Sequence, residues 1–152
     1  MNKPTAKSVS LFADYLELTK PRLTSLVIAT AMVGFFLGSP SEIDLATGAL
    51  MVIGMIAVVG GGNALNQYWE RDVDALMHRT RNRPLPTGRL TSTEAMIFGM
   101  VLSLAGLALL VFAVAPIAAA LAFGGWTTYV LVYTPLKQRT AASTLVGAVP
   151  GA

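Results

Sequence analysis

Long uncharged stretches alternate with short charged segments along this chain of 152 residues. The three longest uncharged stretches contain 19, 25 and 42 residues, at positions 23–41, 45–69 and 95–136. A helix needs about 20 mostly apolar residues to cross the hydrocarbon core of a membrane. The first two stretches are therefore long enough for one span each, and the third for two. The pattern predicts transmembrane helices at about 21–38, 45–68, 94–114 and 117–135, with a further helix from residue 141 onward.

The composition supports an integral membrane protein. Hydrophobic residues make up 54% of the chain and charged residues only 12%, about half of the roughly 25% that soluble domains carry. We therefore predict an all-α, polytopic transmembrane helix bundle. The chain has no cysteine, which excludes disulfides and cysteine-bound zinc, and its single histidine leaves little room for a multi-histidine metal site. The polar first ten residues do not resemble a signal peptide.

The positive charges predict the orientation of the helices. All 11 lysines and arginines lie before or at the start of the first predicted span, between the second and third, or after the fourth. The other two connections contain none. By the positive-inside rule, we expect the N-terminus and both basic connections on the cytoplasmic side.

Two local patterns concern helix ends and helix packing. Thr91 and Glu94 have the spacing of a capping box at the start of the third predicted span. The glycine triplet 60–62 lies late in the second span, where small residues let helices approach closely. We expect this triplet to serve packing.

The most informative polar residues lie at the end of the second predicted span. Asn66, Glu70 and Asp74 follow one another at intervals of four residues, which places them within an arc of about 80° on one helix face. An amide and two carboxylates supply oxygen ligands suited to Mg²⁺. Arg71 lies about 60° from Asp74, close enough to help hold an anion, whereas Asp72 points about 160° away from Asp74.

A basic segment follows at once. Residues 78–89 contain four arginines and two prolines, and arginine is well suited to bidentate phosphate binding. Arg79 and Arg83 are the candidates from this segment for binding a diphosphate. The alternative is that these arginines only set the topology, but their position beside the acids favours a Mg²⁺-diphosphate site.

Tyr133 and Lys137 end the fourth predicted span on the same side of the membrane. They are expected either to share the anionic ligand or to be an interface tyrosine and a snorkelling lysine. Both possibilities remain open from sequence. Lys20 and Arg22 are expected to anchor the first span.

These motifs resemble those of a known family. The pattern Asn66-x3-Glu70-x3-Asp74, followed by Arg79-Thr80-x2-Arg83-Pro84-Leu85-Pro86-x-Gly88, resembles the first aspartate-rich motif of the UbiA-type intramembrane prenyltransferases. The usual form of that motif has aspartate where this chain has Glu70. The segments 18–22, 133–137 and 143–151 resemble the protohaem IX farnesyltransferase branch in particular. The resemblance runs from about residue 15 to residue 152.

The resemblance implies a bundle of nine transmembrane helices around a central cavity, with two acid-rich motifs that bind Mg²⁺ and an isoprenoid diphosphate. It assigns metal binding and catalysis to Asn66, Glu70 and Asp74. The second motif has no counterpart here, so we expect residues 1–152 to be the N-terminal part of a single transmembrane domain. Diphosphate binding is expected from the following residues: Arg71, Arg79, Arg83, Tyr133 and Lys137.

The activity that the resemblance implies is transfer of a farnesyl group from farnesyl diphosphate to haem B, giving haem O. The expected surroundings are the lipid bilayer of a bacterial inner membrane, with a cytoplasmic catalytic face, and no nucleic acid. Association with haem A synthase or terminal oxidase assembly is a further expectation.

Two alternatives remain open from sequence. One is another branch of the superfamily, such as a hydroxybenzoate polyprenyltransferase or a chlorophyll synthase. The other is a membrane transporter or a non-catalytic membrane subunit, in which Glu70 and Asp74 would mark a cation pathway.

Overall fold

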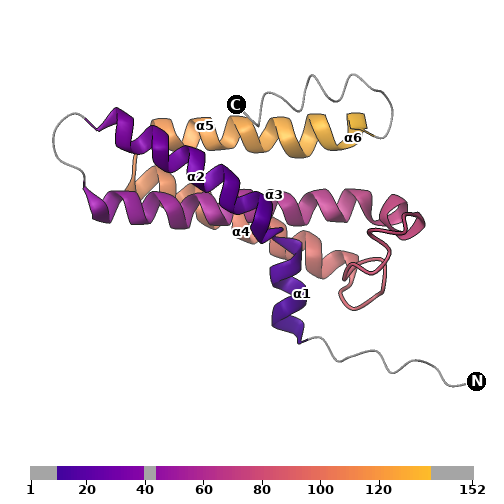
Figure 1. The fold of residues 1–152 in the computed structure, drawn as a ribbon. Helices are drawn as coiled ribbons and strands as arrows, with labels where there is room; N and C mark the ends of the chain where they lie inside the picture. The colour runs from indigo at the N-terminus through magenta and orange to yellow at the C-terminus, as the bar shows by residue number, and fades with distance from the viewer. Residues whose placement is uncertain (1–9, 40–43, 138–152) are drawn as a thin grey trace, which may run out of the picture.

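The computed structural model describes residues 10–39 and 44–137, and every regular element in these two ranges is a helix. In chain order they are α1 (Leu11–Leu18), α2 (Pro21–Gly38), α3 (Leu45–Leu76), α4 (Ser92–Ala113), α5 (Pro116–Thr127), the π-helical segment η1 (Thr128–Tyr133) and α6 (Thr134–Lys137). The last three form one continuous rod. Figure 1 shows that the long helices run along a common direction, whereas α1 runs across it.

In the part of the chain that the structure describes, four helices are long and apolar enough to cross a membrane, which confirms the predicted fold class. They are α2, α3, α4 and the rod from Pro116 to Lys137. The predicted end of the second helix at residue 68 is wrong, because α3 continues to Leu76. The predicted end was set by the charged residues that begin at Glu70. The helix itself continues, because no glycine or proline lies between residues 69 and 76. The helix predicted from residue 141 onward lies outside the described residues.

The short helix α1 was not predicted. Ser10 caps its first turn by accepting a hydrogen bond from the backbone N–H of Ala13 at 3.3 Å. Lys20 then turns the chain into α2 with a left-handed backbone (φ 48°), and Pro21 occupies the first helical position. Because α1 contains two acids, Asp14 and Glu17, within eight residues, it does not form an uncharged stretch of the sequence.

Glycines bring α3 and α4 into close contact. A Cβ atom on Gly61 would lie 2.6 Å from the carbonyl oxygen of Gly99 and 2.7 Å from the backbone nitrogen of Ser103. A Cβ on Gly106 would likewise lie 2.7 Å from the carbonyl oxygen of Gly54. The neighbours of Gly61 in the triplet face other elements, since Gly60 meets Thr19 and Gly62 meets Trp126. The predicted packing role of the triplet is confirmed, with a different partner for each glycine.

The π-helical turn lets the last rod continue through a proline. Pro135 has no backbone N–H and would crowd the carbonyl four residues before it in a regular helix. Thr134 instead donates both its backbone N–H and its hydroxyl to the carbonyl of Tyr129, five residues back, with the hydroxyl at 2.8 Å. This widened turn accommodates the proline and carries the helix on to Lys137.

The connection between α3 and α4 is fixed against α1. Leu85 and Leu90 are buried with Leu18 of α1, and the guanidinium of Arg89 binds the buried carboxylate of Asp14 at 2.8 Å. The predicted capping box begins α4: Thr91 accepts from the backbone N–H of Glu94, whose carboxylate accepts from the backbone N–H of Thr91. The loop therefore has a defined position beside α1.

We expect Gly61→Ala to lower the free energy of unfolding by about 1–3 kcal/mol, because the added methyl group would overlap the backbone of α4. The control is Gly34→Ala in α2, where no atom lies within 4 Å of the new Cβ. Unfolding of both variants in mixed micelles, followed by circular dichroism, provides the measurement. Equal stability of Gly61→Ala and the parent would contradict the close α3–α4 contact.

Candidate functional site

Three polar side chains of α3 form a buried row. Asn66, Glu70 and Asp74 are all buried, although the sequence around them is charged. The junction of α1 and α2 covers the first residue of the row, α6 covers the second and the arginine loop (residues 77–91) covers the third. The predicted common face of these residues is therefore an interior face of the structure.

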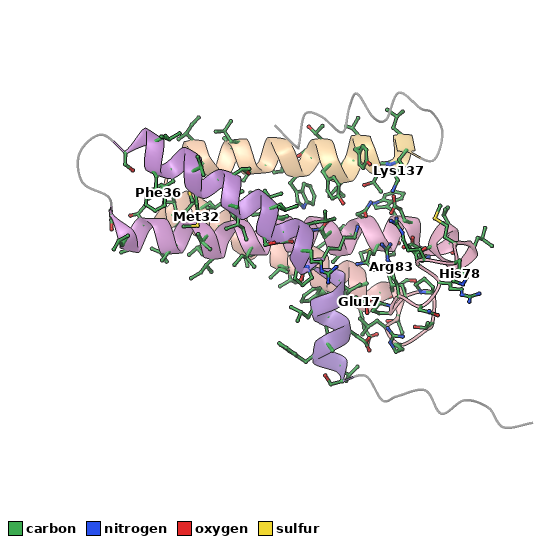
Figure 2. The ribbon with its side chains drawn as sticks, in the orientation of Figure 1. Glu17, Met32, Phe36, His78, Arg83 and Lys137 are labelled. Atoms are coloured by element: carbon green, nitrogen blue, oxygen red, sulfur yellow. The ribbon has the colours of Figure 1, made fainter. Side chains whose placement is uncertain are left out.

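Each member of the row is bound by a cation from a different element. Lys20 Nζ donates to Asn66 Oδ1 at 2.5 Å. Lys137 Nζ donates to Glu70 Oε1 at 3.0 Å. In the loop, Arg83 Nη1 donates to Asp74 Oδ2 at 2.6 Å. Figure 2 shows Arg83 and Lys137 gathered at the same end of the long helices.

Lys20 is the site residue that the sequence did not predict. It was expected to anchor α2, but its amine lies among the site charges. Burial, followed by repulsion from Arg83, lowers the pKa of Lys20 from 10.5 to about 8. Lys137 also lowers this pKa, while Glu70 and Asp74 raise it. The only sign of this role in the sequence is a lysine directly before a proline that can start a helix. The left-handed backbone turn that directs the Lys20 side chain inward cannot be read from the sequence.

A second set of hydrogen bonds ties α3 to the helices around the row. Asn66 Nδ2 donates to the hydroxyl of Thr134 at 3.1 Å. One turn earlier, Asn63 Nδ2 donates to the carbonyl of Thr19 at 3.1 Å, and its amide oxygen accepts from the hydroxyl of Tyr129, also at 3.1 Å. Gln67 Nε2 donates to the last carbonyls of α1. Amides thus fix the positions from which the cations reach the row.

The other predicted diphosphate-binding residues lie apart from this row. Arg71 donates to the carbonyl of Tyr68 at 3.0 Å, and its guanidinium lies 4.9 Å from the centre of the Tyr68 ring. Arg79 is exposed on the loop. Tyr133 is half-buried and stacks on Tyr129 with ring centres 5.8 Å apart. The structure therefore joins Arg83 and Lys137 to the acidic face and leaves Arg71 and Arg79 outside it.

The donor set fits a partly protein-bound Mg²⁺. In residues 10–39 and 44–137, no group of three or more histidine, cysteine or acidic side chains is arranged to hold a metal ion. The row offers two carboxylates and one amide oxygen. Mg²⁺ is commonly bound through one or two carboxylates, with waters and substrate phosphates completing its shell. Binding there would require the cations to turn from the row toward phosphate oxygens.

An apolar cavity of about 410 Å³ lies between α2 and α3, away from the row. Its lining includes Met32, Phe36 and Val52, and Figure 2 shows the first two at the opposite end of the bundle from Lys137. Fourteen residues of helix separate Val52 from Asn66, which is about 21 Å. This cavity is not part of the site.

Comparison with known proteins supports the resemblance. Residues 27–152 match the model of a family described as UbiA prenyltransferase family. A protein of Anaeromyxobacter sp. (strain Fw109-5), named protoheme IX farnesyltransferase, is 48% identical over 145 residues, covering 95% of this chain and 49% of that protein. The protein of the same name from Myxococcus xanthus (strain DK1622) is 43% identical over 152 residues, covering 100% of this chain and 51% of its own length.

A third protein of that name, from Rhodopseudomonas palustris (strain BisB5), is 46% identical over 145 residues, covering 92% of this chain and 45% of that protein. The chain spans about half the length of the curated relatives it matches. A search of solved structures found no significant match.

The low pKa of Lys20 generates a prediction about stability. Between pH 8 and 10.5 the unfolded lysine binds more protons than the folded one, so its contribution makes the protein more stable as the pH rises through this window. We expect Lys20→Met to remove this contribution, up to about 1.4 kcal/mol per pH unit. Unfolding in micelles across the window measures it.

Arg22→Gln is the matched control, because Arg22 is an exposed cation two residues away. It should leave the pH dependence unchanged. If Lys20→Met and Arg22→Gln gave the same pH profile as the parent, the assignment of a buried, desolvated Lys20 would be wrong.

Proposed function

The chain belongs to the UbiA prenyltransferase family, and from that membership we propose that it takes part in transferring a farnesyl group from farnesyl diphosphate to haem B, which yields haem O. The observation that carries the proposal is the row on α3, in which three oxygen-bearing side chains each meet a cation from another element. Support for the acceptor and the transferred group comes from the relatives named protoheme IX farnesyltransferase.

The three cations are suited to hold the diphosphate. Lys20, Arg83 and Lys137 present charged N–H donors within one cluster, and charge-assisted hydrogen bonds to phosphate oxygens are strong. Donors aimed at the departing diphosphate stabilise the negative charge that grows on it as the allylic C–O bond breaks. With these cations turned to phosphate, the oxygens of Asn66, Glu70 and Asp74 would be the groups to hold Mg²⁺, which would supply further charge neutralisation.

Formation of the hydroxyethylfarnesyl group needs only water besides the two substrates. The electron pair of the broken bond leaves with the diphosphate, and C1 of the farnesyl group forms a bond to a vinyl carbon of haem B. Water adds to the other vinyl carbon and loses a proton, which gives a hydroxyethylfarnesyl group. Exclusion of bulk water would protect the allylic cation before the new bond forms.

We place this site at the cytoplasmic face of a bacterial inner membrane, with haem A synthase or terminal oxidase assembly as the expected partner. The support for the cytoplasmic face is the positive-inside rule, since the arginine loop and Lys137 lie at the same end of the long helices. The lipid bilayer is then the solvent for the four long helices.

A prenyltransferase with an aromatic or chlorin acceptor is the second candidate, and the names of the relatives count against it. A cation transporter is disfavoured by the pairing of Glu70 with Lys137 and of Asp74 with Arg83. Without an anionic ligand to draw them away from the acids, these cations would repel a transported cation.

We expect Glu70→Gln and Asp74→Asn each to reduce haem O formation by about 100-fold or more, because the charge holding Mg²⁺ and orienting the cations is lost. Membranes containing the full-length protein would be given haem B, farnesyl diphosphate and Mg²⁺, and haem O measured by mass spectrometry. Asp72→Asn is the matched control, since the Asp72 side chain is 84% exposed on the same helix. Undiminished product from both site variants would contradict the proposed metal site.

A second assay tests the acceptor. With farnesyl diphosphate and Mg²⁺ present, we expect the full-length protein to prenylate haem B and to leave 4-hydroxybenzoate unmodified. Competition between the two acceptors in one reaction, followed by mass spectrometry of both products, provides the measurement. Prenylation of hydroxybenzoate without haem O would favour the second candidate.

A further inference from the structure

Helix α1 lies across the direction of the membrane-spanning helices. Figure 1 shows it leaving the start of α2 sideways, at the turn formed by Lys20. A helix that crosses the direction of the spans runs along the plane of the membrane. The helix also sits at the level of the polar row, because Gln67 of α3 donates to the carbonyls of Glu17 and Leu18 at 3.2 and 3.1 Å.

One face of α1 packs against the arginine loop. The buried Asp14 carboxylate accepts from Arg89 Nε at 2.8 Å, and Glu17 Oε2 lies 3.5 Å from Arg89 Nη2. Farther around this face, Leu18 is buried and Tyr15 packs against Phe98 with ring centres 4.9 Å apart. In Figure 2, Glu17 lies on the side of α1 that faces Arg83 and His78, away from the long part of α2.

The opposite face of α1 is apolar and exposed. Phe12 is 76% exposed and Leu16 is 48% exposed. The two residues are four positions apart, so they lie one above the other, and each is about 160° around the helix from Asp14. Since the Asp14 face points to the loop, Phe12 and Leu16 point back toward the level of the spans.

We propose that α1 is an interfacial helix that lies on the lipid surface, with Phe12 and Leu16 inserted among the acyl chains at the boundary with the headgroups. An amphipathic helix in this position buries its apolar face about 5–10 Å into that boundary. The inference depends on the membrane-spanning architecture and goes beyond the proposed reaction.

Two observations favour lipid as the occupant of this face. The exposed apolar surface continues past the turn onto α2, where Leu23 is 52% and Leu26 is 66% exposed on a helix that spans the membrane. Basic residues lie on both sides of α1 in the sequence, with Lys3 and Lys7 before it and Arg22 after it. Lysines and arginines that flank an amphipathic helix in the sequence match anionic headgroups.

Such an attachment would position two of the three site cations. Arg89 joins α1 to the loop that carries Arg83, which binds Asp74 at 2.6 Å. Lys20 forms the turn at the end of α1 and binds Asn66. The lipid surface therefore fixes α1 from outside, while the arginine loop and Lys20 transmit its position to the row.

Spin labelling tests the proposal directly. The 152 residues contain no cysteine, so Phe12→Cys or Leu16→Cys introduces a single nitroxide site among these residues. The full chain would be reconstituted in vesicles of phosphatidylcholine and phosphatidylglycerol. Collision rates with oxygen, which concentrates in lipid, and with a water-soluble nickel chelate would be measured by electron paramagnetic resonance.

Two further labels serve as controls. Leu104→Cys places a label on an exposed apolar position in the middle of α4, and Arg81→Cys places one on an exposed polar position of the loop. We expect the labels at positions 12 and 16 to resemble that at 104, with oxygen accessibility several-fold above nickel accessibility. The label at 81 should show the reverse.

Two outcomes would overturn the proposal. High nickel accessibility at positions 12 and 16 would mean that this face is in water. Low accessibility to both reagents would mean that protein covers it, either another segment of the same polypeptide or a second copy. The measurement does not depend on turnover, so a failed haem assay and a failed interfacial helix are separate results.

Discussion

The structure depends most on the pairing of three buried oxygen-bearing side chains of α3 with three cations. Each of Lys20, Lys137 and Arg83 comes from a different element, so the row fixes the turn before α2, the end of the last rod and the arginine loop at once. Buried charges of this kind are costly to leave unpaired. Removing one partner therefore disturbs the position of an element as well as the charge of the site.

The long helices were predictable because their signal is local. Crossing a membrane requires a long uncharged stretch, and such stretches can be read directly from the sequence. The four-residue spacing of Asn66, Glu70 and Asp74 also survives in the structure, because it depends only on the helical repeat. The position of Lys20 was not predictable in the same way, since it depends on one left-handed residue and on the packing of α1.

The same distinction explains why the arginines separate into two groups. Arg83 reaches Asp74 because the loop returns along α3, held by the buried side chains of Leu85 and Leu90. Arg71 is much closer to Asp74 in sequence, yet it binds the carbonyl and the ring of Tyr68. The angular position of a residue on a helix limits the partners that its side chain can reach. Contacts with other elements then determine which of these partners it binds.

The π-helical turn before Pro135 has a consequence for how this segment can change in length. The rod carries one residue more in this turn than a regular helix would need, and the wider turn absorbs it, so the helix after Tyr133 keeps its angular position. Removing a single residue between Tyr129 and Thr134 would restore a regular helix with Lys137 still on the side of Glu70. It would also bring back the crowding between Pro135 and the carbonyl four residues before it. The extra residue in η1 is thus tied to the proline, and not to the direction in which Lys137 points.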